Sequence, residues 1–193
     1  MSYKRLTPRE CAILLIDHQI GTMGWVNSIS IEDLKRNALM LAKTAAIFNI
    51  PVVLTSSMEE MAQGPLLNEL ETIIPNAFAA RIRRDGIVNA MDDQNFATAV
   101  KATGRNKFIV AGVTNDVCTV YPALSLISLG YDVQVVADAG GSPSKIADDI
   151  AIQRMTVAGV TITSTNSLIA ELTGNWNTPE GLRIITEVIM PAL

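Results

Sequence analysis

The stretch KFIVAGVTNDVCTVYPALSLISLGYDVQVVAD, residues 107–138, decides the fold. Its first six residues form an apolar run that predicts a buried strand, and residues 132–138 predict a second strand in the same way. Residues 117–129, between these two runs, predict a helix that ends at Gly130. A strand, a crossover helix and another strand predict two parallel strands, with the helix packed on one face of their sheet.

The same alternation of strands and helices extends over the rest of the chain. Four more strands are expected, at residues 11–16, 51–55, 77–82 and 160–164. Helices are expected at residues 34–48, 66–73, 92–104, 145–158, 168–172 and 180–189, the first behind a capping box of Ser30 and Asp33. This pattern predicts an α/β fold of three layers (α/β/α) with a six-stranded parallel sheet in the order 3-2-1-4-5-6. A chain of 193 residues is long enough for one core and short for two, so one domain over 1–193 is expected.

Composition argues against several classes of function. The net charge is −4 and no cluster of Lys and Arg interleaves with aromatic residues, so nucleic-acid binding is not expected. One histidine, two cysteines without a CxxC pair and the absence of GxGxxG after residues 11–16 argue against a metal site and a dinucleotide cofactor. The sequence therefore predicts no cofactor.

The apolar residues of the chain bear on its surroundings and its assembly. No apolar run approaches the roughly 20 residues that a membrane helix needs, and the run at residues 11–16 is too short for a signal peptide. A cytoplasmic location without a membrane partner is expected. Hydrophobic residues make up 49% of the chain, and part of this excess is expected to cover the interfaces of a homo-oligomer.

Asp17 and Cys118 are the first candidates for a functional site. In the predicted strand order, strands 11–16 and 107–112 are neighbours at the point where the order reverses, and ligands bind there beyond the carboxyl ends. Asp17 follows the first of these strands, and Cys118 opens the helix after the second. Each also has a plainer interpretation, because Asp17 could cap the following turn and a free cysteine is usually a small buried hydrophobe.

Their proximity would give the two side chains a shared chemistry. The positive end of a helix dipole favours a thiolate and can lower the pKa of a cysteine to roughly 3.5–7.5, so a lowered pKa is expected for Cys118. A neighbouring thiolate would raise the pKa of Asp17, which suits a group that shuttles protons.

Other polar residues near these strands are assigned less active roles. His18 alternates with Asp17 and is expected to point away from it as a structural histidine, while Cys11 is expected to be inert core. Arg81, Arg83 and Arg84 form either a solvated basic loop or a source of one arginine that turns inward.

Three segments together resemble a known family: LLIDHQ (14–19), RDGIVNA (84–90) and the run from AGVTNDVC to VVADA (111–139). They are similar to the isochorismatase-like hydrolases, also called cysteine hydrolases, and above all to the YcaC-type branch. The likeness extends from about residue 10 to about residue 172.

The resemblance implies a three-layer α/β/α fold and a catalytic triad of Asp, Lys and Cys. Asp17 then corresponds to the acid/base and Cys118 to the nucleophile. The lysine is replaced by Arg84, or alternatively Arg83, and an arginine supplies charge but does not trade protons. The family also implies a cis peptide bond after Val113, with the backbone N–H groups of Thr114 and Cys118 directed at an oxyanion.

The function expected from these residues is hydrolysis of a small amide or related C–N bond through a thioester on Cys118. The family resemblance favours this over ether cleavage, because isochorismatase itself works without a cysteine nucleophile. Two alternatives stay open, an ether hydrolase that uses Asp17 and a non-catalytic oligomeric scaffold. The substrate is expected to be neutral or small rather than a polyanion, and the residues expected to line its pocket are Gln19, Trp25, Asn89 and Tyr121.

Overall fold

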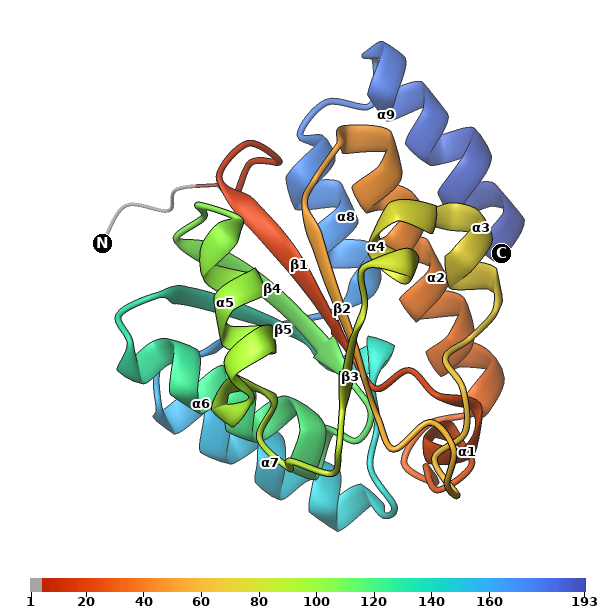
Figure 1. The fold of residues 1–193 in the computed structure, drawn as a ribbon. Coiled ribbons are helices and arrows are strands. Elements are labelled where there is room, and N and C mark those ends of the chain that lie inside the picture. The colour runs from red at the N-terminus through yellow and green to blue at the C-terminus, as the bar shows by residue number, and fades with distance from the viewer. Residues whose placement is uncertain (1–4) are drawn as a thin grey trace.

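The computed structural model describes residues 5–193 and contains one parallel sheet between two layers of helices (Figure 1). The strand order is β3-β2-β1-β4-β5-β6, so the predicted topology is confirmed. The strands are β1 Cys11–Ile16, β2 Val52–Ser57, β3 Ile82–Arg84, β4 Lys107–Gly112, β5 Asp132–Val136 and β6 Thr161–Thr163. Every neighbouring pair is parallel.

The helices divide between the two faces of the sheet. The α-helices are α1 Ile20–Met23, α2 Ile31–Phe48, α3 Glu69–Ile73, α4 Pro75–Ala79, α5 Gln94–Ala102, α6 Val120–Ser128, α7 Lys145–Val157, α8 Thr165–Thr173 and α9 Pro179–Arg183. Residues of α2, α3 and α8 pack in one core cluster and residues of α5, α6 and α7 in another, on opposite sides of the sheet (Figure 1).

Strand β1 shows why the sequence produces this arrangement. Ile13 and Leu15 pack in the core cluster of α2 and α8, whereas Leu14 and Ile16 pack in the cluster of α5 to α7. Successive side chains of a strand point to opposite faces, so a central strand covered on both faces must be apolar throughout. The uninterrupted run CAILLI meets that requirement, and its charged successor, Asp17, lies beyond the end of the sheet.

Three expected elements differ from the structure. The strand predicted at 77–82 is wrong, because Pro75 occupies the first turn of α4, where the fixed φ of proline favours a helix, and β3 begins only at Ile82. The helix expected at 117–129 begins instead as a π-helical turn over Asn115–Thr119 and becomes α6 at Val120. The helix expected at 180–189 is α9 followed by a second π-helical segment, Ile184–Ile189.

Candidate active site

Asp17, Arg84 and Cys118 converge at the carboxyl edge of the sheet. Asp17 follows β1, Arg84 is the last residue of β3, and Cys118 lies in the π-helical turn after β4. All three line one small cavity of about 180 Å³. They are called the Asp17–Arg84–Cys118 cluster below.

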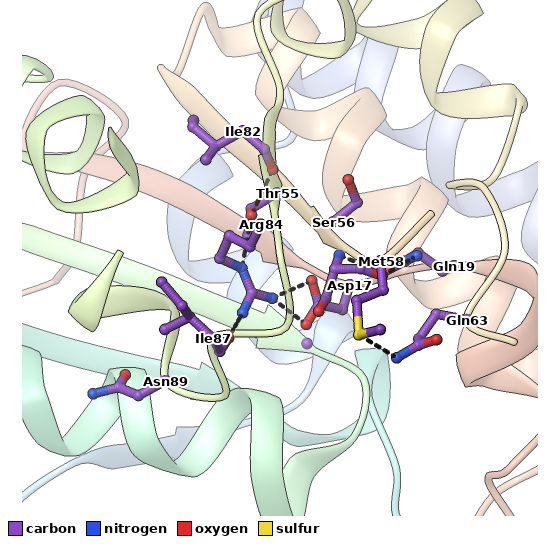
Figure 2. Close-up of polar contacts among 12 residues, drawn as sticks. Asp17, Gln19, Thr55, Ser56, Met58, Gln63, Ile82, Arg84, Ile87 and Asn89 are labelled. Atoms are coloured by element: carbon purple, nitrogen blue, oxygen red, sulfur yellow. Dashed lines mark hydrogen bonds and ion pairs between the residues drawn. The ribbon is translucent and has the colours of Figure 1, made fainter. Parts of the chain in front are cut away.

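Asp17 and Arg84 form a buried ion pair. One guanidinium nitrogen, Nη2 of Arg84, donates to both carboxylate oxygens of Asp17, at 2.5 Å to Oδ1 (Figure 2). Only 1% of the Arg84 side chain and 2% of the Asp17 side chain are exposed. Of the two arginines considered from the sequence, Arg84 is therefore the one that turns inward, whereas Arg83 pairs with Glu59 and is 61% exposed.

The other nitrogens of Arg84 also have partners (Figure 2). Nε donates to the Thr55 hydroxyl at 3.1 Å, and Nη1 donates to the backbone carbonyl of Ile87. The guanidinium thus joins β1, β2 and the loop after β3 around one buried charge. A lysine has a single nitrogen and could not serve these three acceptors from their separate positions.

The backbone around Asp17 fixes where its carboxylate points. Asp17 adopts a left-handed conformation with φ of +57°, which an aspartate tolerates better than most residues. Its N–H donates to the carbonyl of Thr55 at 3.0 Å, which continues the β1–β2 pairing by one residue. The carboxylate therefore leaves the strand in a direction that meets Arg84 and Cys118.

Burial raises the pKa of the Asp17 carboxyl above its usual range, because a carboxylate is poorly solvated in the protein interior. The charge and the hydrogen bond of Arg84 oppose this shift, and a hydrogen bond from Cys118 opposes it further. A raised pKa was expected for Asp17, but its main cause is burial rather than a neighbouring thiolate.

The pKa expected for Cys118 is wrong in direction. Burial, the Asp17 charge and the hydrogen bond to Asp17 raise the pKa of the thiol well above its usual value. A backbone hydrogen bond from Thr114 and the charge of Arg84 act the other way but are smaller. The thiol is therefore neutral at rest, and its proton lies on a hydrogen bond to a carboxylate that can accept it.

The turn that carries Cys118 has an irregular backbone. The peptide bond between Val113 and Thr114 is cis, at the position where the resemblance implied it. The Thr119 N–H reaches back five residues to the Thr114 carbonyl at 3.0 Å, and the Thr119 hydroxyl donates to Gly112 at 2.9 Å. The N–H of Thr114 is directed at the Cys118 sulfur, which places one backbone donor beside the thiol.

Trp25 lies where the sequence predicted it, on the wall of the cavity, and is 46% exposed. Gln19 does not line the cavity. Its side chain is fully buried, accepts from the Ser57 N–H at 2.8 Å and donates to the carbonyls of Ser57 and Gly64. These bonds fasten the segment after β1 to the end of β2, so the Gln19 amide has a structural role.

Asn89 and Tyr121 also lie outside the cavity lining. Asn89 caps a short 3₁₀ turn by accepting from Met91 N–H, and its amide donates to Asp92 and Ser125, away from the Asp17–Arg84 pair (Figure 2). The ring of Tyr121 stacks under the guanidinium of Arg154, with 5.2 Å between them. The expectation that these two residues line the pocket is therefore corrected.

The sequence did not single out the other lining residues one by one. Besides the cluster and Trp25, the cavity is lined by Thr22, Ser57, Met58, Gln63, Gly86, Ile87, Val88 and Val117. Ile87 and Val88 lie in the RDGIVNA segment, whose position after β3 could have identified them. Thr55, the partner of Arg84, could have been found from its place near the end of β2, the strand beside β1.

His18 and Cys11 lie apart from this chemistry. The His18 ring is fully buried, its Nε2 donates to the carbonyl of Ala139 at 2.8 Å, and burial lowers its pKa to about 4. Cys11 is buried at the start of β1, where burial raises its pKa to about 12. Within residues 5–193, no group of three or more His, Cys, Asp or Glu side chains is arranged to hold a metal ion.

Comparison with known proteins agrees with this architecture. The sequence model of the isochorismatase domain matches residues 11–167. The chain belongs to the isochorismatase-like hydrolase family. It is 41% identical to the probable hydrolase YcaC of Escherichia coli over 181 residues, which is 93% of this chain and 86% of the relative.

Two solved structures have the same fold in detail. YcaC from Pseudomonas aeruginosa, with hexane-2,5-diol and covalent acrylamide, has a TM-score of 0.92 and 40% identity, covering 100% of this chain and 95% of that one. YcaC from E. coli, an octameric hydrolase of unknown specificity, also has a TM-score of 0.92 and 40% identity, covering 99% and 93%. The resemblance to the YcaC-type branch is thereby confirmed, and none of the helices in residues 5–193 is long and apolar enough to cross a membrane.

Proposed function

We propose that this hydrolase cleaves a small amide or related C–N bond, with Cys118 as nucleophile, Asp17 as acid and base, and Arg84 as a fixed positive charge. The observation that carries the proposal is the hydrogen bond between the neutral Cys118 thiol and a carboxylate that is both buried and paired with Arg84. A thiol next to a base, which is itself oriented by a third group, is the arrangement of an activated nucleophile.

The first step transfers a proton. The Asp17 carboxylate accepts the proton of the Cys118 thiol while the sulfur attacks the carbonyl carbon of the substrate. Because burial raises the pKa of Asp17, its carboxyl is a stronger base than one in water. Arg84 keeps its protons and offsets the negative charge that the pair shares.

The tetrahedral intermediate then collapses to a thioester. The Thr114 N–H, which is directed at the sulfur, and the Cys118 N–H are the proposed donors to the oxyanion. Asp17 returns its proton to the leaving nitrogen, the C–N bond breaks, and the acyl group stays on Cys118. A water molecule, whose proton passes to Asp17, next attacks the thioester. The C–S bond breaks, the carboxylic acid leaves, and Asp17 returns the proton to the sulfur, which restores the Cys118 thiol.

The cavity supports a small, neutral substrate. The volume of about 180 Å³ is below the roughly 300–1,000 Å³ of sites that take drug-sized ligands, and the walls are mainly apolar, with Trp25, Ile87 and Val88 among them. Arg84 is the basic side chain of the lining, and its donors already serve Asp17, Thr55 and Ile87. A substrate carboxylate would find no free cation among these lining residues, and acrylamide, bound covalently in the P. aeruginosa relative, is a neutral amide of suitable size.

A homo-oligomer in the cytoplasm is the proposed working form. The E. coli relative is octameric, and α7 presents three exposed apolar side chains on one side, Ile146, Ile150 and Val157. Light scattering coupled to size exclusion checks the assembly, and a monomer at micromolar concentration would overturn this part of the proposal.

The decisive experiment follows the alkylation of Cys118 by iodoacetamide from pH 4 to pH 10, in a Cys11→Ala background. The wild-type site is expected to react at neutral pH, with an acid limb set by Asp17. Asp17→Asn is expected to lose this neutral phase and to react only at alkaline pH, because the thiol then has no base. Asp85→Asn, which changes an exposed carboxylate beside Arg84, is the matched control and is expected to behave as wild type.

Turnover is tested in parallel with small aliphatic amides, by ammonia release and by the mass of the acyl group on Cys118. An acyl-Cys118 species that forms in wild type but not in Asp17→Asn supports the proposal. A thiol that titrates near the free value of about 8.5, unaffected by Asp17→Asn, would contradict it and favour the scaffold or the ether hydrolase. Vinyl-ether cleavage that survives Cys118→Ala would single out the ether hydrolase.

A further inference from the structure

We infer that Thr55 is a positioning residue for both charged members of the cluster, holding Asp17 by its carbonyl and Arg84 by its hydroxyl. This inference rests on the proposed function. Thr55 is fully buried in β2, between β1 and β3, and does not line the cavity, so it cannot touch a substrate there.

The hydrogen bonds of the Thr55 hydroxyl have a defined direction. Its single proton goes to the carbonyl of Ile82 at 2.8 Å, so a lone pair of Oγ1 is left for the Arg84 Nε–H at 3.1 Å (Figure 2). Arginine has no acceptor, so the direction of the Arg84 bond is fixed as well. The threonine thereby sets the position of Nε, the atom where the guanidinium joins its side chain.

The backbone of the same residue holds the carboxylate. The Thr55 carbonyl accepts from the Asp17 N–H at 3.0 Å, at the residue where the chain turns into its left-handed conformation. One buried residue thus contacts both partners of the ion pair through different atoms. Loss of its hydroxyl would release Arg84 on the Nε side and leave the guanidinium anchored only by Ile87 and Asp17.

The arginine makes this arrangement possible. The family resemblance implies a lysine at this position. The ammonium group of a lysine has one nitrogen, and that nitrogen would be paired with Asp17. The Thr55 contact therefore belongs to the guanidinium, and Thr55 and Arg84 act as a unit. Their effect on Asp17 is electrostatic, since Arg84 and Cys118 are the ionisable groups that act on the carboxyl, and the neighbouring His18 ring is turned to Ala139.

The direction of the effect follows from the charge of Arg84. A guanidinium that is less firmly held stabilises the Asp17 carboxylate less, so the acid limb of Cys118 alkylation moves to higher pH. For Thr55→Val we expect a shift of about one pH unit, which is about a tenfold loss of rate on the limb. Thr55→Ser keeps the hydroxyl and is expected to restore the wild-type limb.

The experiment measures this acid limb with iodoacetamide in the Cys11→Ala background. Thr44→Val is the matched control, because Thr44 is equally buried but bonds only to Met40 within α2. It is expected to lose stability without moving the limb. In an Arg84→Lys background, Thr55→Val is expected to add little further shift, since the lysine does not use the hydroxyl.

Each outcome decides one question. If the wild-type limb is present and is lost in Asp17→Asn, but Thr55→Val matches wild type, the positioning role is overturned and the proposed function stands. A shift of equal size with and without the Arg84→Lys change would also overturn it, because the effect would then be general. A wild type without a neutral phase would instead refute the proposed function. Thr55→Ala, which removes the hydroxyl without adding a methyl group, replaces Thr55→Val if that variant does not fold.

Discussion

Arg84 places a single nitrogen, Nη2, against both carboxylate oxygens of Asp17, and only 1% of the Arg84 side chain and 2% of the Asp17 side chain are exposed. Its two other nitrogens are fixed by Thr55 and Ile87. The charge is therefore immobile, and an immobile cation can tune the proton affinity of Asp17 without taking part in proton transfer. A lysine ammonium in the same place has one nitrogen, so it could not be held at three separate nitrogens as the guanidinium is.

The first prediction concerns the loss of this charge. Arg84→Met is expected to destabilise the protein by about 3–5 kcal/mol, because the buried Asp17 carboxylate loses its partner. The pKa of Asp17 should rise further, since burial raises it and the opposing charge is gone. Urea denaturation at pH 7 and the acid limb of Cys118 alkylation measure the two effects. Arg83→Met, at the exposed neighbour, should change neither, and a stable Arg84→Met protein with an unmoved limb would contradict the role of the charge.

The second prediction separates the two cysteines. Cys118→Ser is expected to lower amide hydrolysis by at least about a thousandfold, because an alcohol is a far weaker nucleophile than a thiol that hands its proton to Asp17. Cys11→Ala should leave the rate unchanged, since Cys11 is buried at the opposite end of β1. Initial rates of ammonia release measure both. Retention of more than a tenth of the activity in Cys118→Ser would remove Cys118 from the mechanism.

The third prediction assigns substrate contact to Trp25. Trp25→Ala should raise KM for a small amide by about tenfold with little change in kcat, because an aromatic wall supplies apolar contact that is the same in ground and transition states. Trp176 is similarly exposed, at 39%, but does not line the cavity, so Trp176→Ala is the matched control. Steady-state kinetics distinguish them, and equal effects of the two changes would exclude a direct contact by Trp25.

The sequence predicts the sheet well because burial of a strand on both faces requires an uninterrupted apolar run, which is easily recognised. A central strand such as β1 must be apolar at every position, and the helices between strands keep their own period, so the order of strands follows from the alternation. In an edge strand this apolar pattern is weaker. β3 has only three residues and follows a short helix started by Pro75, so its beginning could not be placed from apolar content.

The site could be predicted only where it depends on chain order. Asp17 and Cys118 follow neighbouring strands, so topology alone brings them together. The failures concern hydrogen bonding, which sequence patterns do not encode. Gln19 is adjacent to the site in sequence, yet its amide is consumed by the backbone of Ser57 and Gly64. The prediction of a lowered pKa for Cys118 failed for a related reason. Burial and Asp17 raise the pKa of the thiol more than the positive charge and the backbone donor around the turn lower it.

The last prediction uses His18, whose pKa is lowered to about 4 by burial, from about 6.5 in an unfolded chain. The folded state therefore binds fewer protons than the unfolded state between these two values. The stability due to the neutral ring is fully present above about pH 6.5, and it is lost progressively as the pH falls to about 4. The loss amounts to about 3 kcal/mol, the energy of a shift of this size.

His18→Gln removes the titrating group but keeps an amide N–H that can donate to the Ala139 carbonyl, as Nε2 does. The variant is expected to be less stable than wild type at pH 7.5, because its fit is poorer, and to lose less stability on acidification. Urea denaturation at pH 7.5, 5.5 and 4.5 gives the difference between the two proteins at each pH. Parallel curves over this window would show that the ring is protonated as easily in the folded state as in water, contrary to its burial beneath the carboxyl edge of the sheet.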